Sequence, residues 1–266
     1  MALFKKDDMK MQAVKKAVDS KENSSFLLSE NSPFNLVEAF RKLKVSLSVS
    51  VPKKENRGIS ITVTSSYPED GKTTVSVNLA LMFAMSSSAK VLIVDSDIRK
   101  GRIAKIFGGK TKPGLSEYLS GQATLEQVIR KSEANENLNY IACGTHSPKP
   151  YELLESEKMK ELDEQLRERY DYIIYDTTPT LLVSDGIAIA SITDGTVIVC
   201  RHLHSYESDL AKCINTLKFA EINILGVVVN DYKNLAEKRV GGYKRYYDYS
   251  KYSYGSTSPE KDPDEE

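Results

Sequence analysis

Short apolar segments alternate with segments of helical periodicity along most of this chain. Runs rich in Val, Ile and Leu predict strands, and the continuous apolar run at residues 91–94 predicts a strand buried on both faces of a parallel sheet. We expect these strands at residues 59–63, 91–94, 138–142, 172–176, 196–200 and 224–229. We expect helices that start after Pro33 and that cover residues 75–86, 156–169 and 205–219. The alternation predicts an α/β fold with a mostly parallel β-sheet and helices on both faces.

The two ends of the chain do not follow this pattern. Residues 1–30 are polar and predict an N-terminal arm, which leaves residues 31–232 for the domain. Residues 233–266 form a tail that holds six of the 15 tyrosines within twelve positions, separated mostly by polar residues. The six are Tyr243, Tyr246, Tyr247, Tyr249, Tyr252 and Tyr254. This spacing predicts neither strand nor helix, and the composition of the tail predicts disorder.

Composition and charge exclude only a few classes of function. The 37 basic and 37 acidic residues give a net charge of zero, so there is no global argument for a nucleic-acid partner. Cys143, Cys200 and Cys213 are odd in number and widely spaced, which favours a reducing cytoplasm over a disulfide framework or a zinc site. No apolar run approaches the roughly 18 residues of a membrane-spanning helix. We therefore expect a cytoplasmic protein. If it works at a membrane, something other than this chain must hold it there.

Residues 64–74 combine a strand end, a tight turn and a helix start, which is what a phosphate-binding P-loop requires. In this interpretation Lys72 reaches the β- and γ-phosphates, Thr73 takes a Mg²⁺ position, and Gly71 lets the backbone approach the phosphates. Ser66 occupies the first glycine position, and two acidic residues lie inside the loop. Taken alone, the segment is equally compatible with an ordinary strand-to-helix turn that carries an exposed lysine.

Aspartates at the ends of two further apolar strands strengthen the P-loop interpretation. Asp95 and Asp97 follow the strand at 91–94, and Asp176 ends the strand at 172–176. A lone aspartate after a strand is more often a helix cap than a ligand. Three of them beside a P-loop favour Mg²⁺-dependent phosphoryl transfer, because that chemistry depends mainly on positioning and on neutralising charge.

The tail offers a phosphate acceptor within the same chain. From Asn230 to Tyr243 is 13 residues, which could reach roughly 40 Å when extended and so enter its own site or that of a neighbouring subunit. An ionised aspartate beside a phenol would assist attack by taking its proton late in the reaction. An aromatic tail used only for binding remains an equally open alternative.

Several motifs together resemble one family, the bacterial tyrosine kinases (BY-kinases) of capsule and exopolysaccharide clusters. Ser-Ser-Tyr-Pro-Glu-Asp-Gly-Lys-Thr-Thr resembles the Walker A motif of this family, and Val-Leu-Ile-Val-Asp-Ser-Asp-Ile-Arg-Lys resembles its Walker A′ motif. Tyr-Ile-Ile-Tyr-Asp-Thr-Thr-Pro resembles its Walker B motif, and residues 144–154 resemble a further stretch. The tyrosine cluster completes the resemblance, which covers nearly the whole chain and implies a P-loop NTPase-like fold.

The resemblance implies a protein-tyrosine kinase that uses ATP and Mg²⁺ to phosphorylate its own tail, mainly between subunits of a ring-like homo-oligomer. It further implies a transmembrane adaptor of the polysaccharide co-polymerase type, which would activate the kinase and recruit it to the inner face of the membrane. A cognate tyrosine phosphatase and a role in capsule or exopolysaccharide synthesis and export are also implied. No nucleic-acid partner is expected.

Site residues are carried over by position from the family motifs. The resemblance implies that Lys72 is catalytic, that Asp95 is the base near the tyrosine, and that Asp97 and Asp176, with Thr73 and Asp95, organise the metal shell. The implied nucleotide contacts are Ser66, Asp70, Gly71, Lys72, Thr73, Thr74, Arg201 and Asn230. Glu38, Arg41 and Lys44 fall on the E-x-x-R-x-x-R helix that the family uses at subunit contacts, although by themselves they would predict only a solvated helix face.

Three positions depart from the family pattern. Lys44 replaces the final arginine of the helix motif, Glu69 stands where glycine is usual, and Thr178 replaces the first of two prolines after Asp176. Two alternatives to an autokinase therefore remain. One is a ParA/MinD-like ATPase switch without kinase activity, although such proteins usually carry an extra lysine early in the P-loop and residues 65–70 contain none. The other is a catalytically weak scaffold.

Overall fold

The computed structural model describes residues 27–29, 32–52, 55, 57–85 and 89–232. The predicted tyrosine-rich tail, and the predicted arm except for residues 27–29, lie outside these ranges. The strands are β1 (Ile59–Ser65), β2 (Val91–Asp95), β3 (Ile129–Lys131), β4 (Leu138–Ile141), β5 (Tyr172–Asp176), β6 (Gly195–Arg201) and β7 (Ile224–Asn230). The longer helices are α2 (Phe34–Ser50), α3 (Lys72–Met85), α8 (Glu157–Arg169) and α10 (Glu207–Phe219). The shorter ones are α4 (Ile103–Ile106), α5 (Leu115–Leu119), α6 (Leu125–Val128), α7 (Pro150–Leu154) and α9 (Asp185–Ala190).

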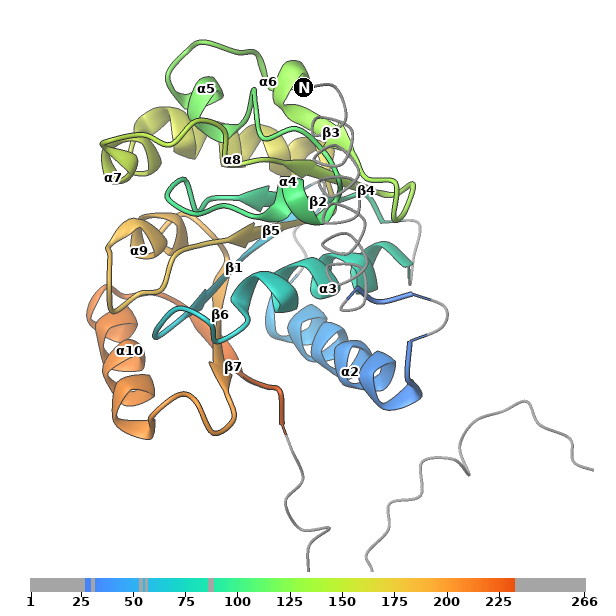
Figure 1. Ribbon diagram of the computed structural model, residues 1–266, viewed down its shortest axis with the longest axis vertical. Helices are drawn as coiled ribbons and strands as arrows, with labels where there is room; N and C mark the ends of the chain where they lie inside the picture. The colour runs from blue at the N-terminus through green and yellow to red at the C-terminus, as the bar shows by residue number, and fades with distance from the viewer. Residues whose placement is uncertain (1–26, 30–31, 53–54, 56, 86–88, 233–266) are drawn as a thin grey trace, which may run out of the picture. The chain divides into compact units, whose positions relative to one another are not determined.

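The seven strands form a sheet in the order β3-β4-β2-β5-β1-β6-β7 (Figure 1). All neighbouring pairs are parallel except β3 and β4, which run antiparallel. Strands β1, β2 and β5 lie in the centre of the sheet and are buried along their whole length. The predicted fold class, a mostly parallel sheet with helices on both faces, is confirmed.

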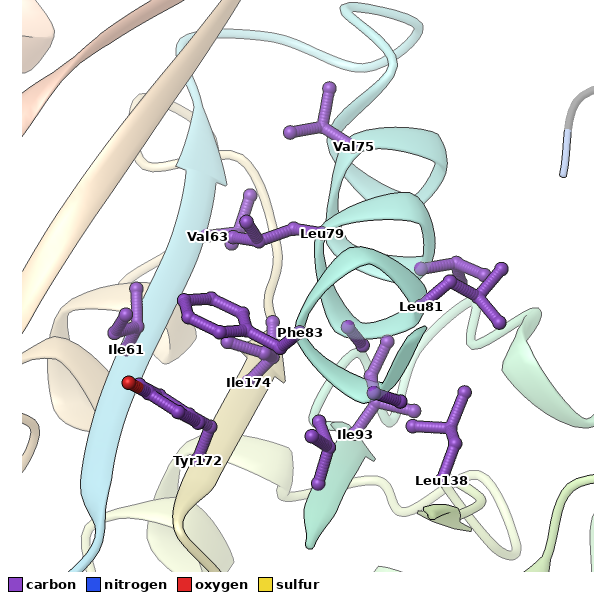
Figure 2. Close-up of a cluster of buried hydrophobic side chains, with 14 of the residues drawn as sticks. Ile61, Val63, Val75, Leu79, Leu81, Phe83, Ile93, Leu138, Tyr172 and Ile174 are labelled. Atoms are coloured by element: carbon purple, nitrogen blue, oxygen red, sulfur yellow. The ribbon is translucent and has the colours of Figure 1, made fainter. Parts of the chain in front are cut away.

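Helices α2, α3 and α4 cover one face of the sheet, and α8, α9 and α10 cover the other. Successive side chains of β5 point to opposite faces of the sheet. Ile174 therefore packs into the core on the α3 side, whereas Ile173 packs into the core on the α8 side. Figure 2 shows side chains of α3 meeting those of the central strands, and there the Phe83 ring stacks on Tyr172 at a centroid distance of 4.0 Å. The two-sided burial explains the continuous apolar runs of the central strands.

Helix α3 differs from the amphipathic segment that its sequence suggested. Every residue from Val75 to Ala84 is buried, including Ser76 and Asn78. The sheet covers one side of α3 and α2 packs on the other, so the helix has no solvent-facing stripe. Leu28, assigned by sequence to the polar arm, is also buried here, and its backbone N–H donates a hydrogen bond to Asn78 Oδ1 at 2.7 Å.

Strand β3 and the short helices α4 to α7 and α9 were not predicted. Most of these elements are only three to five residues long, too short for a periodic pattern to be visible. β3 is Ile-Arg-Lys at the edge of the sheet and carries no continuous apolar run. Within the described ranges, no helix is long and apolar enough to cross a bilayer.

Candidate functional site

The carboxyl ends of β2, β5 and β1 meet at one edge of the sheet, because these strands are parallel neighbours. The register pairs Asp95 with Asp176, and Val63 with Asp176 on the other side. The P-loop leaves β1 at this edge and enters α3 at Lys72. Three motifs distant in sequence are therefore brought together, as expected for ligand sites in open α/β sheets.

Asp176 is held by two hydroxyls of the first turns of α3. Thr73 Oγ1 donates to Asp176 Oδ2 at 2.7 Å, and Ser76 Oγ donates to Asp176 Oδ1 at 2.9 Å. Burial raises the pKa of Asp176 above its usual value, although the charge of Lys72 and the two hydroxyl donors oppose that effect. Ser76, one helical turn beyond Lys72, was not identified from the sequence.

Lys72 and Asp97 face each other across the site. Lys72 Nζ lies 3.7 Å from Asp97 Oδ2, and both side chains are largely buried. Asp97 Oδ1 accepts a hydrogen bond from the backbone N–H of Lys100 at 2.8 Å, which fixes the carboxylate. Both residues line a cavity of about 390 Å³, together with Thr73, Arg99 and further residues of the P-loop and of the segments after β2 and β5.

Asp95 belongs to the same cluster but does not line that cavity. Its side chain has no exposed surface, and Oδ2 accepts a hydrogen bond from the Ile103 N–H at 3.0 Å. Oδ1 is buried and has no hydrogen-bond partner among the residues that the structure describes. Gly101 and Cys143 close over it, since a Cβ at Gly101 would lie 2.5 Å from Asp95 Oδ2. Burial, and then the negative charge of Asp176, raise the pKa of Asp95 well above its usual value.

These donors fit a Mg²⁺ ion that arrives with a nucleotide. In the described part of the chain, no three His, Cys, Asp or Glu side chains are grouped tightly enough to hold a metal by themselves. Mg²⁺ usually keeps several waters and binds one or two carboxylates plus substrate phosphates, so it needs no such cage. The Thr73 hydroxyl on Asp176 and the nearby Asp97 carboxylate supply protein oxygens of the right kind. The unpartnered Oδ1 of Asp95 is a further acceptor in the same cluster.

The two acidic residues of the P-loop differ in burial, since Asp70 is buried and Glu69 is exposed. The Asp70 side chain is buried, and it accepts hydrogen bonds from Ser205 Oγ at 2.7 Å and from the Tyr67 N–H at 3.2 Å. Its carboxylate therefore braces the loop. Glu69 is exposed, lines the 390 Å³ cavity, and has a φ of 68°, a left-handed conformation that glycine adopts more readily.

A second cavity of about 850 Å³ also borders the P-loop. It is lined by Leu36 and Phe40 of α2, by Thr74, and by the two late candidates Arg201 and Asn230, among others. Asn230 Nδ2 donates to the Asp70 carbonyl at 3.0 Å and occupies the space that a Cβ on Gly71 would need, 1.9 Å away. Arg201 pairs with Asp231 at 3.0 Å. Ser66 lines neither cavity, and its hydroxyl donates to the Asp209 carbonyl at 3.4 Å.

Two arginines at the site were not among the predicted site residues, although Arg99 lies inside the stretch that resembles the Walker A′ motif. Arg99 holds Asp185 through two hydrogen bonds, from Nε at 2.6 Å and from Nη2 at 3.2 Å. Arg102 lines both cavities. Both follow the aspartates of β2 within seven residues of Asp95, so their position after a strand end was the available signal.

Comparisons with known proteins identify the family. A family model described as an AAA domain matches residues 61–225. Tyrosine-protein kinase ptk of Acinetobacter johnsonii is 36% identical over 79% of this chain and 28% of its own length. Tyrosine-protein kinase YwqD of Bacillus subtilis is 31% identical over 77% of this chain and 85% of its own length. The chain belongs to the bacterial tyrosine kinase family.

Solved structures agree with this assignment. The kinase domain of Escherichia coli tyrosine kinase ETK matches with a TM-score of 0.69 at 31% identity, covering 81% of this chain and 87% of that domain. The cell division ATPase MinD of Pyrococcus furiosus matches less closely, with a TM-score of 0.56 at 27% identity, covering 66% of this chain and 73% of MinD. The chain spans less than a third of the length of some curated bacterial tyrosine kinases, such as ptk.

The helix that the family resemblance assigned to subunit contacts is α2. Arg41 Nη1 and Glu38 Oε1 form an ion pair one turn apart on its surface. Partial burial, and then the charge of Arg41, lower the pKa of Lys44. In this bacterial tyrosine kinase the three side chains therefore lie on one helix, with two of them already paired within it.

Proposed function

We propose that this bacterial tyrosine kinase is an ATP-dependent autokinase that phosphorylates its tyrosine cluster, Tyr243 to Tyr254, mainly in trans. The observation that carries the proposal is the grouping of Lys72, Thr73 and Asp97 around one cavity, with the Thr73 hydroxyl bound to Asp176. This arrangement provides a cation for phosphates, oxygens for Mg²⁺, and carboxylates beside the place where a phenol would enter.

In this proposal Lys72 leaves Asp97 and contacts the β- and γ-phosphates of bound ATP, which frees the Asp97 carboxylate. Mg²⁺ bound with ATP would neutralise part of the phosphate charge. The phenol oxygen attacks the γ-phosphorus, the bond from that phosphorus to the oxygen bridging to ADP breaks, and the phenolic proton passes late to a carboxylate. Asp95 is the proposed acceptor, because no described residue hydrogen-bonds its Oδ1. The cover formed by Gly101 must then open.

We further propose that the enzyme acts within a ring-like homo-oligomer that uses Glu38, Arg41 and Lys44, and that a transmembrane adaptor recruits it from the cytoplasm to the inner face of the membrane. The names of relatives support a role in polysaccharide synthesis and export, since one is a putative tyrosine-protein kinase in the cps region of Klebsiella pneumoniae. The similar structure of the chimerical protein CapA2B2, whose name combines two Cap parts, supports an accessory chain. A cognate phosphatase would reset the tail.

Intact mass after incubation with Mg²⁺-ATP tests the autokinase. We expect stepwise additions of single phosphates in the wild type, and none in Lys72→Met or in a full-length chain with all six tail tyrosines changed to phenylalanine. The phenylalanine variant is the sharper control, because it leaves the nucleotide site unchanged. Phosphate on residues outside the tail of that variant would overturn the assignment of the acceptor.

The rival function is a ParA/MinD-like ATPase switch, which the likeness to MinD supports at the level of the fold. The two functions differ in where the γ-phosphate goes. ATP hydrolysis by the wild type without any gain in protein mass would favour the switch.

A further inference from the structure

A strongly basic surface begins at the mouth of the phosphoryl-transfer cavity. Residues 99–112 contain six basic and no acidic residues. Arg99 is matched by Asp185, but Arg102, Lys110 and Lys112 have no ion-pair partner among the residues that the structure describes. All three are exposed. We name Lys100, Arg102, Lys105, Lys110 and Lys112 the basic surface.

This surface is fixed to the domain and connected to the site. Ile103 and Ala104 of α4 are buried in the core, and the Phe107 ring packs on Tyr140 of β4 at a centroid distance of 5.1 Å. At one end, Lys100 and Arg102 line the 390 Å³ cavity. The cations are therefore held beside the cavity that contains Lys72 and Asp97, and they continue away from it along the chain.

The first part of the tail is basic, whereas its end is acidic and so complements the charge of the basic surface. Residues 233–251 carry six basic and two acidic side chains, whereas residues 260–266 carry five acidic side chains and one lysine. The acidic end begins six residues after Tyr254, a separation that spans at most about 20 Å. A tyrosine from the end of the cluster could thus occupy the cavity while the acidic end lies on the basic surface. The basic first part of the tail would be repelled from that surface.

We propose that the basic surface binds the acidic end, residues 260–266, of a second copy of the chain, and so presents Tyr252 and Tyr254 to the site before the other tyrosines. The inference rests on the proposed autokinase function and adds an order of modification. Complementary charge at the rim of a site acts mainly on encounter and register, so the expected effect is on rate and order, and it weakens as salt is added.

A binding measurement tests the docking without any kinase activity. The probe is a labelled peptide of residues 250–266, and the protein is the full chain with amides at the five acidic positions of residues 260–266, so that its own end does not compete. We expect peptide binding to fall about fivefold or more in Lys110→Glu/Lys112→Glu, because two attractive charge contacts become repulsive. The matched control is Lys212→Glu/Lys218→Glu on α10, which should bind like the parent. Equal binding by both double variants would overturn the proposal.

A charge exchange and a time course complete the test. A peptide with lysines at its five acidic positions should bind Lys110→Glu/Lys112→Glu better than the parent does. In wild type with Mg²⁺-ATP, phosphate should appear on Tyr252 and Tyr254 first, and that order should be lost in Lys110→Glu/Lys112→Glu. An unchanged order would overturn the docking while leaving the autokinase intact, and a tail that gains no phosphate despite peptide binding would overturn only the autokinase. Vesicles containing phosphatidylserine that bind the parent but not Lys110→Glu/Lys112→Glu, with unchanged peptide binding, would assign the surface to a membrane instead.

Discussion

Two buried clusters of charge lie on opposite faces of β5, and they are built differently. On the α8 side, the Arg167 guanidinium donates to Asp163 at 2.5 Å and also to Asp194 and Ser60, while the Tyr175 hydroxyl donates to Asp163 at 2.9 Å. We name these five residues the α8 network. On the other side lies the carboxylate site, where Lys72 is the cation beside Asp95, Asp97 and Asp176. Within the described ranges, Oδ1 of Asp95 has no hydrogen-bond partner.

The comparison indicates that the charges of the α8 network stabilise the fold, whereas the charges of the carboxylate site lack a counter-charge that a ligand would supply. Each hydrogen-bonding group at the centre of the α8 network has a partner within the protein, which is the condition under which buried charge is tolerated. The carboxylate site has an excess of negative charge that a cation and its nucleotide would complete. Tyr175 and Asp176 are successive residues, so one peptide bond joins the two clusters.

The largest expected effect comes from breaking the α8 network. Arg167→Ala would leave Asp163 and Asp194 buried or half-buried without their cation, and removing one partner of a buried pair costs about 3–5 kcal/mol. Urea denaturation should show this loss in the free energy of unfolding. Arg169→Ala is the matched control, because Arg169 pairs with Glu126 at the exposed surface and should cost less than about 1 kcal/mol. Similar losses for both variants would contradict the distinction.

At the carboxylate site the same logic predicts the opposite sign. Asp95→Asn removes a buried carboxylate from beside Asp176 while keeping an oxygen to accept the Ile103 N–H. We expect the free energy of unfolding without nucleotide to rise by about 1 kcal/mol, which corresponds to a melting temperature about 2–4 °C higher for a domain of this size. Thermal unfolding measures it. A destabilised variant would show that Asp95 contributes to the fold instead.

The stabilisation by Asp95→Asn should depend on pH. Burial, and then Asp176, raise the pKa of Asp95 well above 3.8, so the folded protein keeps this proton at a pH where the unfolded chain has lost it. The protonated Asp95 makes its full contribution to stability below the pKa that this carboxyl has in the unfolded chain. That contribution is lost as the pH rises through the pKa that Asp95 has in the folded protein. The advantage of Asp95→Asn should therefore be largest at neutral pH and should shrink as pH falls toward about 4. A constant difference between the two proteins across that range would be inconsistent with a raised pKa.

The smallest expected effect concerns the backbone of the P-loop. Glu69 has a φ of 68°, which costs a residue with a Cβ about 1 kcal/mol or more relative to glycine. Glu69→Gly removes that strain, which should stabilise the fold, and it also removes a negative charge at the rim of both cavities, so ATP should bind several-fold more tightly. Isothermal titration with Mg²⁺-ATP measures the affinity, and Glu69→Gln is the control that removes only the charge. Equal affinities of Glu69→Gly and Glu69→Gln would assign the whole effect to charge.

The central strands and the ends that carry chemistry could be predicted from the sequence, because both signals are local. The apolar runs that end in Asp95 and Asp176 predict buried parallel strands, and the two aspartates predict a ligand site at the carboxyl ends of those strands. The family resemblance is confirmed by the comparisons, whereas the roles carried over to individual residues stay predictions.

Other features depend on residues that are far apart in sequence. The burial of Asp70 requires Ser205, which lies 135 positions away, and the α8 network joins Ser60 to Arg167 across 107 positions. No periodicity within a segment encodes such pairs. Cys143, which covers Asp95 together with the nearby Gly101, comes from a different segment of the chain, so the complete burial of Asp95 could not be predicted from a motif.

The contact between Asn230 and Gly71 has a consequence for reaction order. Asn230 ends β7 only three residues before the tail begins, so each tail is covalently attached beside the P-loop of its own chain. A tether of limited reach sets an effective concentration, typically millimolar for short flexible linkers, which does not change when the solution is diluted. Within an intact assembly, tail phosphorylation should therefore be first order in the complex and insensitive to total protein, until dilution separates the subunits.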